Sequence, residues 1–143
     1  MMSEPNKQRF GGVARLHGEI GMQKLSNAHV CVIGIGGVGS WVVEALARSG
    51  VGEITLIDAD DVCVSNINRQ IHALSETIGQ EKVTAMAQRV KSINPDCQVN
   101  PETTFFIEST AEKLLAANYD FVVDLQKNAR SIKLRKLLGK PSA

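Results

Sequence analysis

The stretch that decides the fold is His29–Asp58, HVCVIGIGGVGSWVVEALARSGVGEITLID. Residues 30–35 form a short apolar run, rich in β-branched side chains and without a helical period, which predicts a buried parallel strand. After a cluster of glycines, apolar residues recur at helical spacing over 42–47, and a second apolar run follows at 53–57. This order predicts a strand, a tight turn, a helix and a second strand in one continuous segment.

Three of the glycines, Gly34, Gly36 and Gly39, match the pattern G-x-G-x-x-G. In that pattern one glycine permits the tight turn, the next lets a phosphate approach the backbone, and the last lets the helix pack closely on the strand. Asp58 follows nineteen positions after Gly39, where a carboxylate can accept hydrogen bonds from a ribose hydroxyl. Glycines that merely close a turn are the alternative interpretation. The combination instead predicts a nucleotide site, for NAD, FAD or ATP.

The composition is that of one domain. The 143 residues are 43% hydrophobic and 22% charged, which is enough for one core of ordinary size. No apolar run approaches the length of about 18 residues that spans a membrane, and the N-terminus lacks the apolar region of a signal peptide, so we expect a cytoplasmic protein. Cys31, Cys63 and Cys97 form no C-x-x-C pair, so neither a zinc site nor a disulfide framework is expected.

The N-terminal part predicts a disordered segment followed by a broken helix. Residues 1–9 are polar and are expected to be disordered. Over 10–26 the apolar residues have the spacing of a helical stripe that packs on the first sheet unit, and glycines interrupt this helix. The stripe consists of Val13, Leu16, Ile20 and Leu25, and the interruptions are Gly18 and Gly21.

Two further helices and two further strands are expected after Asp58. In chain order they are a helix opened by residues 79–82 and running to about Ile93, where Asn94-Pro95 stops it, a strand over 97–99, a helix over 112–117 capped by Ser109 or Thr110, and a strand over 119–124. The alternation predicts an α/β fold, a Rossmann-like doubly wound parallel sheet. With four strands it is only the N-terminal part of such a sheet, an incomplete one.

A few single residues need a separate interpretation. Lys82 falls in the first turn of its helix, where a cation opposes the helix dipole. A solvated surface lysine is the plain interpretation, but this position beside a phosphate site favours a lysine that meets an anion. Trp41 is most simply a core residue. His17, His29 and His72 are isolated in sequence, and each is expected to be packed or on the surface rather than a ligand.

Several long motifs carry a resemblance to a known family. They are RFGGVARLHG (9–18), GIGGVGSWVVEALARSGVGEITLIDADDVCVSNINRQIHAL (34–74), GQEK (79–82), INPD (93–96) and YDFVVD (119–124). Together they resemble the adenylate-forming enzymes related to ubiquitin-activating enzymes and to the activators of sulfur-carrier proteins. Within that group the first motif and the phrase NRQIHAL are most similar to the tRNA threonylcarbamoyladenosine dehydratases, which cyclise a modified adenosine next to the anticodon. The resemblance covers about residues 9–124.

The resemblance implies an ATP site and names its residues. Gly34, Gly36, Gly37 and Gly39 correspond to the loop that cradles ATP, Asp58 to the acid that holds the ribose, and Asn66, Arg69 and Lys82 to the polar residues that bind the triphosphate, with Asp60 and Gln70 as second choices. Arg69 and Lys82 are the expected catalytic residues, because fixed cations stabilise the charge that develops on phosphoryl oxygens.

The family also implies a reaction and partners. A substrate carboxylate attacks ATP, giving an acyl-adenylate and pyrophosphate, and in the dehydratases the carbamoyl group then closes onto the activated carbonyl and releases AMP. The implied substrate is tRNA, and related enzymes act on carrier proteins instead. Dimeric relatives send an N-terminal arginine into the partner's site, a role that Arg9 or Arg15 would fill here. The residue-level alternatives are a plain NAD-binding module and a non-catalytic nucleotide-binding fragment.

The end of the chain departs from the family. Members continue with a second aspartate that coordinates magnesium, whose place holds Lys127 here, and with a further half that supplies more strands. Residues 1–126 carry a net charge of −5, whereas 127–143 contain six basic residues and no acid. We therefore expect residues 125–143 to be a basic tail from a shifted reading frame or a truncated copy. A basic helix that contacts RNA or an acidic membrane is the rival hypothesis.

Overall fold

The structure is a computed structural model that describes residues 3–126. The basic segment 127–143, and with it the position that Lys127 occupies, lies outside the described residues. Within the described part, no helix combines the length and the apolar character needed to cross a bilayer.

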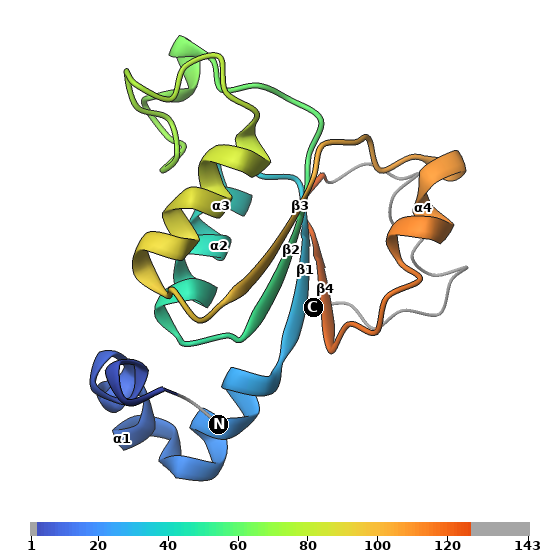
Figure 1. Ribbon diagram of the computed structural model, residues 1–143. Helices are drawn as coiled ribbons and strands as arrows, with labels where there is room; N and C mark the ends of the chain where they lie inside the picture. Colours follow the sequence, from blue (N-terminus) through green and yellow to red (C-terminus); the bar gives the residue numbers. More distant parts are fainter. Residues whose placement is uncertain (1–2, 127–143) are drawn as a thin grey trace.

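A four-stranded parallel sheet forms the centre of the molecule (Figure 1). Its strands are β1 (His29–Ile33), β2 (Glu53–Ile57), β3 (Gln98–Glu102) and β4 (Phe121–Asp124), in the order β3-β2-β1-β4. Ile33 pairs with Ile57 on one side and with Asp124 on the other, so the carboxyl ends of β1, β2 and β4 meet at one edge. The predicted α/β, Rossmann-like parallel sheet is confirmed.

Helices cover both faces of this sheet. Helices α2 (Gly39–Arg48) and α3 (Lys82–Ile93) lie on one face, and α4 (Glu108–Leu114) lies on the other (Figure 1). Because side chains alternate along a strand, Val30 and Val32 belong to the core under α2 and α3, whereas Cys31 and Ile33 belong to the core under α4. Burial on both faces explains why β1 is a continuous apolar run in the sequence.

Helix α1 (Glu4–Asn27) corrects the prediction of disorder over residues 1–9. Ser3 caps the helix by accepting a hydrogen bond from the backbone N–H of Asn6 at 3.4 Å, and Pro5 stands in the first turn, where its missing N–H costs nothing. The side chain of Asn6 is buried and donates to Asn94 Oδ1 at 2.9 Å. This contact with the end of α3 orders a segment whose polar composition predicted the opposite.

The predicted break of this helix at Gly18 is confirmed, because Gly18 has a φ of +74° inside α1. The predicted apolar stripe is wrong in part: Leu16 and Ile20 are 77% and 73% exposed, while Phe10 and Met22 are buried. A kink interrupts the period of 3.6 residues, so positions on opposite sides of Gly18 no longer share one face.

The later boundaries differ modestly from those expected. Helix α3 ends at Ile93, as predicted, and Asn94 follows it as the cap. Helix α4 starts at Glu108 rather than 112 and ends at Leu114, and its cap residue is Ile107, whose N–H donates to Thr110 Oγ1 at 3.1 Å. In this arrangement a side chain three positions after the cap residue accepts a hydrogen bond from the backbone N–H of the cap residue. Thr110 thus helps to start the helix without being its cap.

Candidate functional site

The candidate site lies at the carboxyl edge of the sheet, at a topological switch point. From β1 the sheet continues to β2 and β3 on one side and to β4 on the other. Loops that leave β1 and its neighbours therefore diverge at this edge, which is where ligands bind in open α/β sheets. The glycine-rich loop follows β1, and Asp58 directly follows β2.

Two of the glycines are required by the local geometry. Gly34 has a φ of +89°, and this left-handed conformation turns the chain sharply out of β1. The N–H of Gly34 donates to Ile57 O at 2.9 Å. A Cβ on Gly39 would lie 1.7 Å from Gly34 O, so only glycine lets α2 start this close to the strand. The structure thus gives both residues the packing roles that the motif predicts.

Gly36 and Gly37 face side chains of another loop. A Cβ on Gly36 would meet only the Gln70 amide nitrogen, at 3.8 Å, and a Cβ on Gly37 would meet the Arg69 side chain at 3.5 Å. These are ordinary van der Waals distances, so the space above the two glycines is open apart from these side chains. The side chains of Gln70 and Arg69 therefore lie next to Gly36 and Gly37, in the loop that is predicted to cradle ATP.

Asp58 is buried and joins two loops. Its Oδ2 accepts a hydrogen bond from Ile35 N at 2.7 Å, and its Oδ1 accepts one from Asp60 N at 2.8 Å. Each carboxylate oxygen has room for a second donor, so these bonds orient the group without using up its acceptor capacity. Its predicted role in holding a ribose remains a prediction, and the geometry adds a role in shaping the site.

Lys82 is not a solvated surface residue. Its side chain is only 8% exposed, and its Nζ lies 3.7 Å from Oδ2 of Asp60, while its backbone N–H donates to Asp60 O at 3.0 Å. Asp60 is largely exposed and is a weak partner for a buried ammonium group. The structure thus gives Lys82 a protein carboxylate as a neighbour, and its predicted contact with an anion of the phosphate site stays a prediction.

Asn66 shapes the loop that carries Arg69 and Gln70. It ends the short 3₁₀ helix η1 (Val64–Asn66), where its side-chain Oδ1 accepts from Cys63 N at 2.9 Å. Its carbonyl accepts from Arg69 N at 3.1 Å and from Gln70 N at 3.0 Å. Asn66 is buried, so the structure gives it a structural duty beside its predicted contact with a triphosphate.

Arg69 is exposed, and its guanidinium bonds only within its own loop among the described residues. Its Nη1 donates to Ser65 O and to Asn68 Oδ1, both at 3.0 Å, and no acid within residues 3–126 forms an ion pair with it. Its planar fork can therefore still bind an anion, as phosphate recognition requires.

Sequence reasoning missed three residues of this site. Ser40 is fully buried; its Oγ donates to Gly36 O at 2.6 Å and accepts from Ile71 N at 3.3 Å. Trp41, predicted to be core, is 52% exposed and donates its indole N–H to Arg69 O at 2.8 Å. The sequence contained a signal for the place of Ser40 and Trp41 in the site, because both stand in the first turn of the helix that follows the glycine-rich loop.

His72 is the third missed residue. The sequence predicts that His72 is either packed or on the surface, and it is buried. Its Nε2 donates to Ile35 O at 2.8 Å. Burial lowers the pKa of His72 below its ordinary value of 6.5, and the charge of Lys82 lowers it further. Its Nδ1 and the buried Gln70 Oε1 have no hydrogen-bond partner within the described residues, so the site holds spare acceptors.

The acidic, cysteine and histidine side chains of the described residues are spread over the fold. Within residues 3–126 no group of three His, Cys, Asp or Glu side chains is arranged to hold a metal ion. The position expected for the magnesium-coordinating aspartate lies outside this range.

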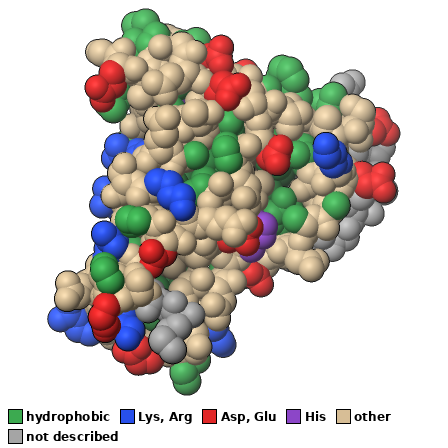
Figure 2. Space-filling model, in the orientation of Figure 1, with side chains coloured by type: hydrophobic (Ala, Val, Ile, Leu, Met, Phe, Trp, Pro, Cys, Tyr) green, Lys and Arg blue, Asp and Glu red, His purple; other side chains and the backbone are tan. Residues whose placement is uncertain are grey.

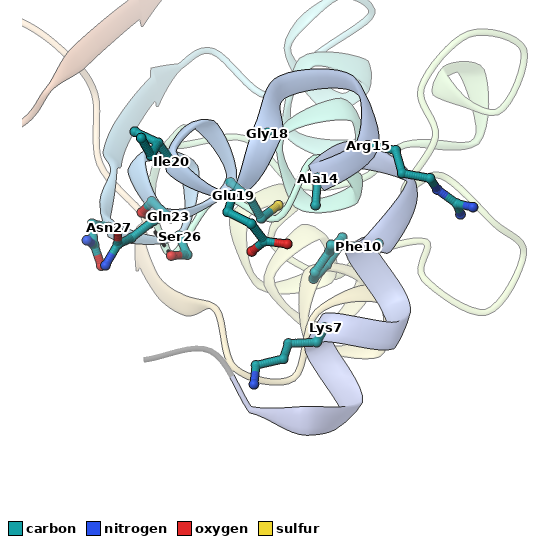
Figure 3. A pocket seen from close by; sticks show the side chains of 12 residues that line it. Lys7, Phe10, Ala14, Arg15, Gly18, Glu19, Ile20, Gln23, Ser26 and Asn27 are labelled. Atoms are coloured by element: carbon teal, nitrogen blue, oxygen red, sulfur yellow. Dashed lines mark hydrogen bonds between the residues drawn. The ribbon is translucent and has the colours of Figure 1, made fainter.

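A separate pocket of about 610 Å³ lies between the two halves of α1 (Figure 3). Phe10 and Met22 are among its lining residues, together with Arg15, whose side chain extends away from the pocket in Figure 3. None of the predicted ATP-site residues lines it. This pocket is therefore distinct from the site at the carboxyl edge of the sheet.

The chain is similar to curated relatives of known activity. It is 54% identical over 125 residues to the tRNA threonylcarbamoyladenosine dehydratase of Haemophilus influenzae, covering 87% of this chain and 48% of that protein. It is 36% identical over 108 residues to the molybdopterin-synthase adenylyltransferase of Salmonella typhimurium, covering 76% of this chain and 43% of that protein. The chain thus spans about half the length of these relatives.

A solved structure has the same fold. The crystal structure of the Escherichia coli tRNA threonylcarbamoyladenosine dehydratase in complex with ATP superposes with a TM-score of 0.95 at 45% sequence identity, covering 99% of this chain and 60% of that chain. The model of the ThiF family matches residues 11–140, which include the glycine-rich loop, Asp58 and the loop of Arg69. On this match and these identities, the chain belongs to the ThiF family.

Proposed function

We propose that this chain is the nucleotide-binding part of an ATP-dependent adenylating enzyme of tRNA modification. The observation that carries the proposal is the convergence of the glycine-rich loop, Asp58, Lys82 and Arg69 at one edge of the sheet. A relative with the same fold was crystallised with ATP, which supports ATP over NAD or FAD. Arg69 and Lys82 also have no evident use with a dinucleotide.

The residues of the site divide the work on ATP. The glycine-rich loop and the start of α2 cradle the phosphates, and Asp58 binds the ribose. Arg69 approaches from a loop and Lys82 from the first turn of α3, and both stabilise the negative charge that develops when a carboxylate attacks the α-phosphate. Because Lys82 is buried, it acts from a fixed position, which favours stabilisation of the transition state.

The proposed substrate is the threonylcarbamoyl group of tRNA. Its carboxylate attacks the α-phosphorus of ATP and expels pyrophosphate, which leaves an acyl-adenylate. The carbamoyl group then attacks the activated carbonyl carbon, the carbon–oxygen bond to AMP breaks, and AMP leaves with the oxygen that the ring closure removes. The net result is loss of one water from the substrate at the expense of ATP.

The choice of tRNA over a carrier protein follows the degree of similarity. Identity is 54% to a tRNA dehydratase and 36% to a molybdopterin-synthase adenylyltransferase. On the face shown in Figure 2, Lys and Arg side chains are mixed with Asp and Glu, so the charge of this face does not favour tRNA over a carrier protein. Adenylation of a carrier protein is therefore the second candidate.

We further propose a cytoplasmic homodimer in which an arginine of α1 reaches the partner's site. Arg9 already donates to Asn6 Oδ1, whereas Arg15 is exposed and extends outward in Figure 3. Arg15 is thus the better candidate for this role.

Isotope exchange between pyrophosphate and ATP, measured with threonylcarbamoylated tRNA as the carboxylate that is adenylated, tests the proposed site together with calorimetric ATP binding. Exchange should be lost and ATP binding measurably weakened in Asp58→Ala and Arg69→Ala, and both signals should be retained in the charge-removing controls Glu112→Ala and Lys113→Ala, which lie on α4 across the sheet. Equal signals in all four variants would exclude this site. Mass spectrometry of threonylcarbamoylated tRNA incubated with ATP then separates the substrates: a cyclised nucleoside supports tRNA, and the absence of both exchange and cyclisation despite ATP binding supports a carrier protein.

A further inference from the structure

Trp41 connects the start of α2 to the loop of Arg69. Its Nε1–H donates to the carbonyl oxygen of Arg69 at 2.8 Å, across 28 positions of sequence. The indole is 52% exposed, so it contributes less to the core than a tryptophan usually does. A large aromatic residue held at a surface position by its single polar atom needs an explanation other than packing.

The remaining hydrogen bonds of Arg69 are local. Its backbone N–H donates to Asn66 O, and its Nη1 donates to Ser65 O and Asn68 Oδ1. These bonds fold the loop but leave its position relative to the glycine-rich loop undetermined. Three bonds set that position: the Trp41 bond, the longer bond of 3.3 Å from Ile71 N to Ser40 Oγ, and the bond of 2.8 Å from His72 Nε2 to Ile35 O. Of these, only the Trp41 bond is made to Arg69 itself.

The Arg69 side chain returns over the glycine-rich loop. Its Cδ lies 3.5 Å from where a Cβ on Gly37 would stand, and its Cγ and Nε lie 3.7 Å from the same point. Trp41 thus holds the backbone of Arg69 while the side chain extends over Gly37. The two contacts together place the stem of the Arg69 side chain, up to Nε, beside the glycine-rich loop.

We propose that Trp41 is the positioning residue for Arg69, holding its guanidinium where the terminal phosphates of a nucleoside triphosphate bind. The proposal rests on the function proposed above and adds a residue to its site. The Arg69 carbonyl belongs to an exposed residue, so water can replace the indole N–H when it is removed. Loss of the bond therefore affects the position of Arg69 far more than the stability of the fold.

Calorimetric titration of the full chain with ATP and with AMP tests this role. Trp41→Phe keeps an aromatic ring and removes the N–H, and Tyr119→Phe is the matched control, because it also removes one hydrogen bond to a backbone carbonyl, that of Leu114. We expect Trp41→Phe to weaken ATP binding about three- to tenfold, with AMP binding and the melting temperature nearly unchanged. Tyr119→Phe should leave both affinities unchanged.

A double-mutant cycle with Arg69→Ala separates positioning from a general structural effect. If Trp41 acts through Arg69, Trp41→Phe has no further effect on ATP affinity once Arg69 is Ala. Additive losses, or equal weakening of ATP and AMP, would overturn the role of Trp41. If Arg69→Ala alone leaves ATP binding intact, the proposed function of the site fails instead.

The protein also carries its own reporter, because Trp41 is its single tryptophan. ATP should change the tryptophan emission of the unmodified chain and should change it much less in Arg69→Ala. An ATP titration that calorimetry detects but the emission does not follow would contradict the coupling of Trp41 to bound ATP through Arg69.

Discussion

The backbone N–H of Ile35 donates a hydrogen bond to Oδ2 of Asp58 at 2.7 Å. This bond ties the loop after β1 to the loop after β2, and both residues are buried. Asp58 therefore organises the candidate site before any nucleotide binds, and its two roles, structural and ligand-binding, are separable by experiment.

Asp58→Asn tests the structural role. An amide has one acceptor oxygen and a donor NH₂ group, so either Ile35 N or Asp60 N loses its acceptor and faces a donor. We expect a loss of about 1–3 kcal/mol in the free energy of unfolding, measured by urea titration. Asp120→Asn is the matched control, because its exposed carboxylate accepts from His29 N at 2.8 Å. An equally small effect of both substitutions would contradict the organising role of Asp58.

Gly39 and Gly37 form a matched pair within the glycine-rich loop. A Cβ at Gly39 would lie 1.7 Å from Gly34 O, so Gly39→Ala must displace α2 from β1 and should cost roughly 3 kcal/mol or more. A Cβ at Gly37 meets nothing closer than Arg69 Cδ at 3.5 Å, so Gly37→Ala should fall within roughly 1 kcal/mol of the parent. Thermal unfolding of both variants measures the contrast, and similar melting temperatures would refute it.

Glu44 should make stability depend on acid pH. It is buried between α2 and α3, where Arg89 donates to it at 2.6 and 3.0 Å and Arg48 at 2.8 Å. Burial alone raises the pKa of Glu44, but the hydrogen bonds from Arg89 and Arg48 outweigh it, so the pKa lies below its ordinary 4.5. A lowered folded-state pKa means that the stabilisation is complete above 4.5 and is lost as the pH falls through the folded-state value.

Glu44→Gln removes this contribution. At neutral pH it should lower the free energy of unfolding by about 1–3 kcal/mol, and the difference from the parent should shrink as the solution is acidified. Urea titrations across the acid range measure both quantities. Glu112→Gln, at an exposed position of α4, should show neither effect. A difference that stays constant with pH would contradict the ion pair.

Thiol labelling distinguishes the three cysteines. Cys63 is exposed, whereas Cys31 and Cys97 are buried. Burial raises the pKa of Cys31 to about 12 and that of Cys97 to about 11, so neither is a thiolate in the native protein at mildly alkaline pH. A thiol reagent should modify Cys63 at once and the other two roughly a hundredfold or more slowly, at the rate of local unfolding. Rapid labelling of all three would show that the sheet is not formed.

The local pattern of the sequence was enough for the central fold. The apolar run of β1, the glycines that follow and the acid after β2 act over a few neighbouring residues, and their conformational demands are the same in any context. Gly34 needs its positive φ because the chain turns there, and Gly39 needs its missing side chain because the helix starts there. Such requirements are visible in a sequence, and the structure confirms them.

The misplaced predictions concern residues whose partners are distant. Asn6 is ordered by its hydrogen bond to Asn94. The kink in α1 turns Phe10 and Met22, rather than Leu16, toward the turn at Gly50. A periodic pattern predicts that a stripe exists, but not which part of a broken helix meets the rest of the molecule.

For the site, the sequence by itself determined the residue types and their order: a glycine-rich loop, an acid, an arginine and a lysine. Only the tertiary structure decided that Lys82 is buried beside Asp60, that Asn66 folds the loop of Arg69, and that Trp41 serves this loop instead of the core. The physical reason is that burial and hydrogen bonding depend on groups brought together across the sheet edge, and no local pattern encodes that meeting.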